Sequence, residues 1–146
     1  LLETEKFQEE HRRLARSIVA FENKKLFQQT LDLILSKHIR AQDATVLIYH
    51  CLSGSDYRDL TWKWIQSNWK TISERYRKDH LLKFIFMGLG GFASMAKAKE
   101  VGDFFKANPA PSADRAIKQA VEQIEINAAW LERSRQDIAN HLRKQL

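Results

Sequence analysis

The five histidines are the residues of this sequence best suited to metal or acid–base chemistry. A zinc hydrolase of the His-Glu-x-x-His type needs two histidines one helical turn apart, with a glutamate base between them. The histidines are scattered instead, at His11, His38, His50, His80 and His141. We expect each of them to be structural or on the surface, so the sequence predicts no metal ligand and no cofactor in this chain.

The cysteine and the glycine-rich stretch offer little for nucleophilic or phosphate chemistry. Cys51 is the single cysteine, and it lies in a short apolar segment, where a thiol is commonly inert. No Gly-x-Ser-x-Gly elbow occurs. The stretch Gly88-Leu89-Gly90-Gly91 lacks the Lys-Ser/Thr of a phosphate loop, and we interpret it as a helix end with close packing. The sequence therefore predicts no catalytic residue.

Composition and charge limit the classes of partner. With 44% apolar residues, four Trp and eight Phe, the chain can bury the core of one domain spanning residues 1–146. The net charge is +6, but the basic residues are spread among eighteen acids without a dense run. The longest apolar stretch, around 84–93, is far shorter than the ~20 residues of a membrane-spanning helix. We expect neither nucleic acid nor membrane as a partner, and the lone cysteine favours a reducing, cytoplasmic location.

The elements that would position any site are predicted to be helices throughout. Good helix formers are abundant, against two prolines and five glycines. Apolar residues recur at spacings of three and four, which predicts about eight helices. These lie around residues 7–21, from after Asn23 to about 37, at 43–51, 57–76 and 81–89, around Val101 to Phe105, and at 112–131 and 134–142.

The clearest element is a tryptophan-rich helix. Its apolar stripe consists of Trp62, Ile65, Trp69, Ile72 and Tyr76. This spacing predicts an aromatic face buried against neighbouring helices. Trp64 lies off the stripe, so it either packs on an adjacent helix, the more ordinary fate of a tryptophan, or meets another domain. The second alternative makes Trp64 the candidate domain-interface residue.

Polar residues, glycine and proline mark the expected helix ends. Asp43, Ser112 and Ser134 are the expected N-caps of three helices. Gly90 and Gly91 are expected to end one helix, and the run 108–111, Asn-Pro-Ala-Pro, to stop another. Short connections favour antiparallel neighbours, which predicts helix pairs stacked as an α-solenoid or HEAT-like array. No repeat of fixed period occurs, so this architecture is inferred from connectivity alone.

Several segments in order resemble the C-terminal helical domain of aminopeptidase-N-type zinc aminopeptidases, closest to the puromycin-sensitive branch. They are Ile39-Arg40-Ala41-Gln42-Asp43, Trp62-Lys63-Trp64-Ile65 with Asn68-Trp69, Gly91-Phe92-Ala93, Glu100-Val101 with Phe104-Phe105, the run 108–113, and Asn127-Ala128-Ala129-Trp130-Leu131. Together they span nearly the whole chain. The chain begins at Leu1 rather than Met, and we interpret it as a C-terminal fragment of a longer protein.

The resemblance implies a noncatalytic role for this chain. In the family, an upstream catalytic domain holds zinc and removes N-terminal residues from peptides by attack of a zinc-activated water. The resemblance then implies that this domain walls the active-site cavity and helps to admit and position peptide substrates. Its expected partners are that upstream catalytic domain and the peptides themselves.

The residues that the resemblance places at the cavity precede the tryptophan-rich helix. They are Ser53, Gly54, Ser55 and Arg58. We hypothesise that Arg58, together with the net positive charge, favours peptides whose carboxylate end reaches this domain. Two other functions stay open: a free-standing helical-repeat scaffold that binds a protein partner, and a nucleic-acid binder, which only the basic balance suggests.

Overall fold

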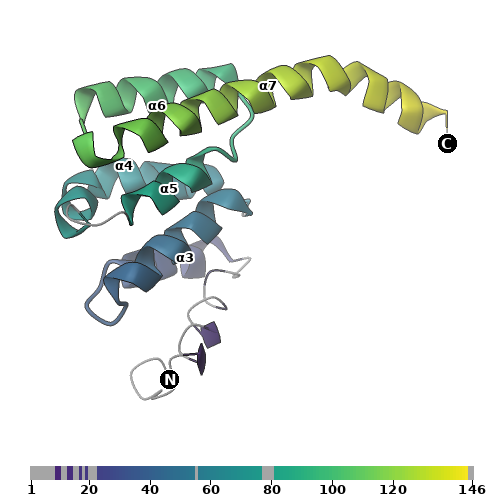
Figure 1. Ribbon diagram of the computed structural model, residues 1–146. Helices are drawn as coiled ribbons and strands as arrows, with labels where there is room; N and C mark the ends of the chain where they lie inside the picture. The colour runs from purple at the N-terminus through teal and green to yellow at the C-terminus, as the bar shows by residue number, and fades with distance from the viewer. Residues whose placement is uncertain are drawn as a thin grey trace.

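The computed structural model describes residues 9–10, 13–14, 17, 19, 23–54, 56–76 and 81–144 (Figure 1). From residue 23 to residue 144, the described residues form six α-helices and one 3-10 turn, without a strand. The elements are α2 (Lys24–Ile34), α3 (Ala41–Ser53), α4 (Arg58–Arg75), α5 (Leu82–Leu89), α6 (Met95–Ala107), the 3-10 turn (Pro111–Ala113) and α7 (Asp114–Arg143). The predicted all-α fold is confirmed. The first predicted helix, around 7–21, falls largely outside the described residues.

The helices follow one another through the molecule, from α2 and α3 at one end to α6 and α7 at the other (Figure 1). α3 packs on α5, α5 packs on α7, and α7 packs on α6. Aromatic rings join α4 to α6, with Trp62 and Phe104 centroids 5.2 Å apart and Trp69 and Phe105 centroids 5.1 Å apart. The α-solenoid or HEAT-like array remains a prediction.

The aromatic stripe of α4 lies in the core, as predicted. Trp62, Ile65, Ile72 and Tyr76 are fully buried, and Trp69 is 7% exposed. The hydroxyl of Tyr76 has no hydrogen-bond partner in the described part of the chain, and burial raises its pKa. The helical spacing of these side chains therefore located the core face of α4 correctly.

α3 and α5 approach each other closely at Gly88. A Cβ placed on Gly88 would lie 2.8 Å from the Cβ of Leu52 and 3.3 Å from the Cα of Tyr49. A contact of 2.8 Å is too short for two carbon atoms, so glycine permits this helix spacing. α5 ends at Leu89 with Gly90 as its C-cap. The glycine-rich stretch is thus a packed helix end, as the sequence indicated.

The last residue of α4, Arg75, holds the C-terminal end of α2. Its guanidinium donates to the carbonyl oxygens of Leu35, of Ser36 at 3.1 Å and of Ile39 at 2.8 Å. Carbonyls at the end of a helix lack partners within the helix, and a positive charge there is favourable. Arg75 therefore joins two helices that are far apart in sequence.

None of the three predicted serine and aspartate N-caps, Asp43, Ser112 and Ser134, caps a helix. α3 begins at Ala41 with Arg40 as its N-cap, because Asp43 accepts hydrogen bonds from the Arg40 side chain instead of capping the backbone. Ser112 lies inside the 3-10 turn, which Pro111 starts with its fixed φ, and α7 follows with Ala113 as its N-cap. Asn23, after which the second helix was predicted to start, caps α2 by accepting from the backbone N–H groups of Lys25 and Leu26.

The break predicted at Ser134 is wrong. α7 runs without interruption for 30 residues, so the two last predicted helices are one. No glycine or proline lies near Ser134, and good helix formers flank it, so continuing the helical hydrogen bonds costs less than starting a new helix. The first half of α7 packs on α5 and α6, and the second half extends away from the rest of the molecule (Figure 1).

Candidate functional site

The junction of α3 and α4 contains the residues predicted to line a cavity. Ser53 is the last residue of α3, and its hydroxyl donates to the carbonyl of Tyr49. Gly54 is the exposed C-cap of α3, with open space where a Cβ would be. Ser55 lies outside the described residues. Arg58 opens α4, and it contacts Ser53 directly through a 2.8 Å hydrogen bond from its guanidinium to the Ser53 carbonyl.

Arg58 has a structural task that the sequence did not reveal. Its guanidinium also donates to the carbonyl of Leu52 and, at 2.6 Å, to the carbonyl of Gly91. The carbon of the guanidinium lies 5.6 Å from the centre of the Phe92 ring. Arg58 therefore ties the C-terminal ends of α3 and α5 to the start of α4, by the same chemistry with which Arg75 holds α2.

Trp64 packs on an adjacent helix. Its indole N–H donates to the Asp32 carboxylate of α2 at 3.2 Å, and the side chain is 9% exposed. This is the packing alternative of the two that the sequence left open. A contact between Trp64 and another domain remains a prediction.

A polar cluster between α4 and α6 was missed from the sequence. The indole N–H of Trp62 donates to Glu100 at 2.7 Å. Lys97 bridges two carboxylates, with its Nζ 2.7 Å from Asp59 and 2.8 Å from Glu100. A buried tryptophan needs an acceptor for its N–H, and this need was the signal in the sequence that an acid would face Trp62.

The charges of this polar cluster stabilise one another. Burial opposes the charged form of Glu100, but hydrogen bonds from Lys97 and Trp62 outweigh it and lower the pKa of Glu100. Burial likewise opposes the charged form of Lys97, yet its bonds to Asp59 and Glu100 leave the Lys97 pKa raised. The cluster therefore stays ionised at neutral pH and joins the two helices, rather than holding a group that exchanges protons.

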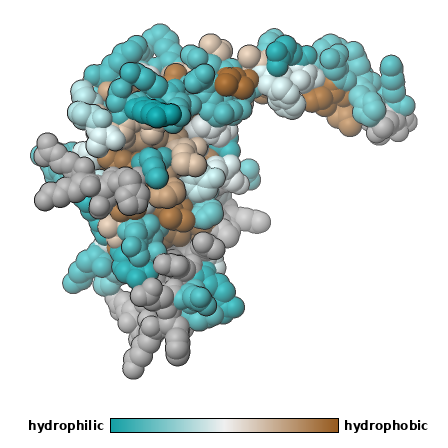
Figure 2. Space-filling view, in the orientation of Figure 1, coloured by the Kyte–Doolittle hydropathy of each residue, from teal (hydrophilic) through white to brown (hydrophobic). Residues whose placement is uncertain are grey.

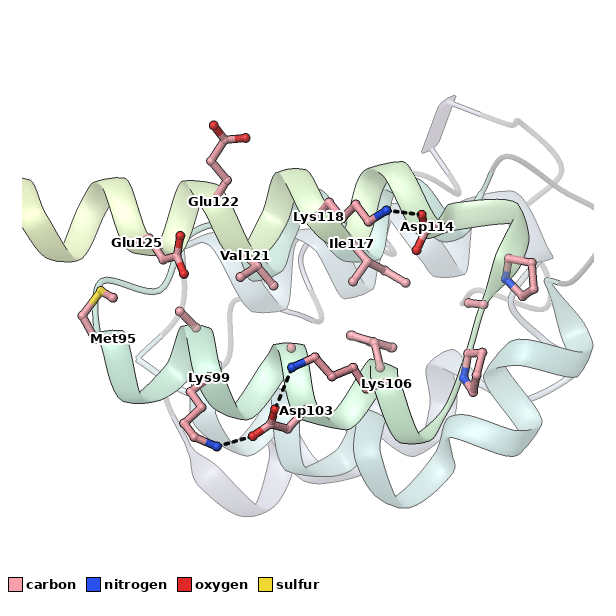
Figure 3. Close-up of a pocket in the computed structure, with 16 residues that line it drawn as sticks. Met95, Lys99, Asp103, Lys106, Asp114, Ile117, Lys118, Val121, Glu122 and Glu125 are labelled. Atoms are coloured by element: carbon pink, nitrogen blue, oxygen red, sulfur yellow. Dashed lines mark hydrogen bonds and ion pairs between the residues drawn. The ribbon is translucent and has the colours of Figure 1, made fainter.

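A groove of about 990 Å³ runs between the antiparallel helices α6 and α7 (Figure 3). Its apolar lining includes Ala98 and Phe105 of α6 and Ile117 and Val121 of α7. Figure 3 shows Ile117 and Val121 directed from α7 towards α6, while charged side chains stand along both edges. Such a groove can hold an apolar segment between charged borders.

The charges along the groove are mostly neutralised in pairs. Asp103 lies between Lys99 and Lys106, and Lys118 pairs with Asp114 at 2.8 Å. The hydrogen bond to Lys99, with that to Lys106, lowers the pKa of Asp103. A carboxylate held ionised between two lysines is poorly suited to accept or donate a proton near neutral pH. The groove therefore supports binding rather than acid–base chemistry.

The described residues include no group suited to a metal ion, and their one cysteine, Cys51, is not activated. Among them, no group of three or more His, Cys, Asp or Glu side chains could hold a metal ion. Burial raises the pKa of the Cys51 thiol to about 12, so the reactive thiolate is not formed near neutral pH. In the same part of the chain, no helix combines the length and the apolar character needed to cross a membrane.

The polar side chain of Asn127 fixes the backbone where α5 ends. Its Nδ2 donates to the carbonyls of Gly90 at 2.8 Å and Phe92 at 3.2 Å, and its Oδ1 accepts from Gln123 at 2.9 Å. α7 is thereby tied to the same turn whose Gly91 carbonyl accepts from Arg58. Asn127 and Arg58 together hold the connection from α5 to α6 in one position.

Comparison with known proteins identifies similar sequences. The family described as "ERAP1-like C-terminal domain" matches residues 1–126. Aminopeptidase M1 of Arabidopsis thaliana is 36% identical over 127 residues, which cover 85% of this chain and 14% of that protein. Glutamyl aminopeptidase of Sus scrofa is 27% identical over 133 residues, which cover 89% of this chain and 14% of that protein. Aminopeptidase 2, mitochondrial, of Saccharomyces cerevisiae is 24% identical over 131 residues, which cover 88% of this chain and 14% of that protein. The chain thus spans about a seventh of the length of these relatives.

Proposed function

Because the chain belongs to the family of ERAP1-like C-terminal domains, we propose that it is the noncatalytic C-terminal domain of a cytoplasmic zinc aminopeptidase. The longer protein hydrolyses N-terminal residues from peptides, and this domain walls the active-site cavity and helps to position peptide substrates. The observation that carries the proposal is the match over most of this chain to proteins named aminopeptidases, each about six times as long.

The chemistry of the described residues supports a noncatalytic role. Zinc needs three or four ligands of the His, Cys or carboxylate type close together, and the described residues do not provide such a group. They do not fit the metal, so we place zinc in the upstream part of the protein. The assignment to the puromycin-sensitive branch stays a prediction, since the names of the relatives given above do not refer to it.

The activity test compares this 146-residue chain with the whole polypeptide that contains it. Both are assayed with aminoacyl fluorogenic substrates, before and after treatment with a chelator and readdition of zinc. We expect hydrolysis by the whole polypeptide, loss with the chelator and recovery with zinc, and no hydrolysis by the chain alone. Hydrolysis by the chain alone, or a whole polypeptide without aminopeptidase activity, would overturn the proposal.

The proposed cavity-lining residues are Ser53, Gly54, Ser55 and Arg58. Gly54 is exposed, and Ser53 and Arg58 are half-buried. Three of the five guanidinium N–H groups of Arg58 donate to backbone carbonyls, which leaves two for another partner such as a peptide carboxylate. This remainder supports the hypothesis that Arg58 favours peptides whose C-terminal carboxylate reaches the domain.

Arg75 is a matched control for Arg58, because it makes the same kind of backbone contacts at the opposite end of α4. Hydrolysis of a long peptide and of its C-terminally amidated form is measured in wild type, Arg58→Ala and Arg75→Ala of the whole polypeptide. We expect Arg58→Ala to lose the preference for the free carboxylate and Arg75→Ala to keep it. Equal preference for the free carboxylate in all three proteins would contradict the proposed role of Arg58 in the cavity.

A further inference from the structure

α7 carries a seven-residue apolar repeat along its whole length. One set of positions, spaced by seven, holds Ile117, Ile124, Leu131 and Ile138. The second set, four residues after each member of the first, holds Val121, Ala128, Arg135 and Leu142. Alternating spacings of four and three place both sets on one stripe, which is the pattern of a helix packed against another helix.

Buried members of the stripe occur only in its first half. We call residues 114–128 the inner half and residues 129–143 the outer half of α7. The buried side chains of α7 are Ala120, Ile124 and Ala128, all in the inner half. In the outer half, Leu131, Ile138 and Leu142 are 44%, 45% and 56% exposed. Figure 2 shows hydrophobic residues along the projecting helix, beyond the body of the molecule.

α7 is too long for the neighbouring helix α6 to cover its whole length. α7 has 30 residues and α6 has 13, which correspond to lengths of about 45 Å and about 20 Å. A helix of this size standing alone in water is marginally stable, and an exposed row of leucine and isoleucine adds an apolar surface. Trp130, also in the outer half, is 53% exposed. The outer half therefore has the composition of an interface.

Arg135 indicates the chemistry of the missing partner. It occupies a position within the stripe, and it has no ion-pair partner among the described residues. A guanidinium enclosed in a helix interface requires a carboxylate opposite it. The partner surface should therefore combine apolar side chains at helical spacing with an acidic residue that faces Arg135.

A second copy of this chain does not meet that requirement. In a parallel pair of outer halves, each Arg135 would face the Arg135 of the copy, so like charges would meet. In an antiparallel pair that aligns Leu131 with Leu142, Arg135 would lie against the apolar Ile138 of the copy, and the neighbouring carboxylate, Asp137, lies off the stripe. Self-association would thus enclose an unpaired charge, which is costly.

We propose that the outer half of α7 is a docking surface for a helix in another part of the same polypeptide, one with an apolar stripe and an acid opposite Arg135. This rests on the proposed function, in which the chain belongs to a protein about six times as long. The interdomain contact is then made by Leu131, Ile138 and Leu142, whereas Trp64 is only 9% exposed and donates to Asp32 of α2.

Hydrogen exchange of the backbone amides of residues 131–142 tests the proposal without an activity assay. It is measured in the whole polypeptide and in the 146-residue chain, the latter at two concentrations differing tenfold. We expect exchange of these amides to be slower by roughly tenfold or more in the whole polypeptide, with no effect of concentration on the chain. Equal rates in both proteins would overturn the proposal, and protection that grows with chain concentration would assign the surface to a second copy instead.

Variants of the whole polypeptide locate the contact. Ile138→Glu and Arg135→Glu should each remove the protection of residues 131–142. Ala129→Glu is the matched control, because it adds one glutamate to the exposed side of the same half of α7, away from the stripe, and it should keep the protection. Loss of protection in all three variants, or in none, would contradict the assignment. Aminopeptidase activity measured on the same samples shows whether the proposed function fails separately from the docking proposal.

Discussion

The inner and outer halves of α7 have the same sequence pattern and opposite surroundings. Ile124 and Ile138 occupy equivalent positions of the repeat, yet Ile124 is fully buried and Ile138 is 45% exposed. The inner half lies where α5 and α6 are present, and the outer half extends past them. An amphipathic repeat thus identifies a face that needs a partner, while the lengths of the neighbouring helices decide where this chain supplies one.

The largest expected difference between the two halves is in the loss of a buried isoleucine. In this chain, Ile124→Ala should lower the free energy of unfolding by about 2–5 kcal/mol, because it leaves a cavity in the packed interior. Ile138→Ala should change it by no more than about 0.5 kcal/mol. Urea denaturation followed by circular dichroism measures both. Similar losses for the two variants would show that the outer stripe is also covered within the chain.

Two asparagines extend the comparison of the inner and outer halves of α7 to their hydrogen bonds. Asn127→Ala should cost about 1–2 kcal/mol, because the carbonyls of Gly90 and Phe92 lose their donor. Asn140→Ala removes only an exposed bond from Gln136, and it should cost no more than about 0.5 kcal/mol. The same denaturation experiment compares them. A neutral Asn127→Ala would mean that water replaces the amide at the end of α5.

The smallest expected difference concerns how stability depends on pH. The pKa of Glu100 lies below its ordinary value of 4.5, so its stabilising effect is present above that pH and is lost as the pH falls through the lowered pKa. Glu100→Gln should therefore make the midpoint of thermal unfolding less sensitive to pH below about 4.5. The effect should correspond to less than about 1 kcal/mol, because solvent screens this half-exposed cluster.

Glu132, in the outer half, provides the control for that titration. It has no ion pair among the described residues and is exposed. Glu132→Gln should leave the acid dependence of thermal unfolding as in wild type. If both variants changed it equally, the bonds from Lys97 and Trp62 would not be the source of the acid sensitivity.

Local patterns predicted those parts of the fold that depend on neighbours in sequence. The spacing of Trp62, Ile65, Trp69, Ile72 and Tyr76 located the core face of α4, and Gly90 located the end of α5. The predicted break at Ser134 failed because a good N-cap residue starts a helix only where the preceding residues leave the helical conformation. A cap residue alone does not create that departure.

Contacts between distant segments could not be predicted in the same way. Arg58 donates to Gly91, which is 33 residues away, and Trp64 donates to Asp32, which is 32 residues away. No local pattern indicates which carbonyl or carboxylate a long side chain will reach once the helices are packed. The resemblance to aminopeptidases identified the family correctly. The backbone contacts of Arg58 could be found only from the packed helices.

The two arginines at the ends of α4 have a consequence for how the domain comes apart. The last carbonyls of a helix normally separate first, since they have no partners within the helix. Here Arg75 and Arg58 hold carbonyls at or just beyond the ends of α2, α3 and α5, so fraying of these ends requires α4 to leave its place. We expect these three helix ends to open in one concerted event together with α4, so that the middle of the domain behaves as a single cooperative unit.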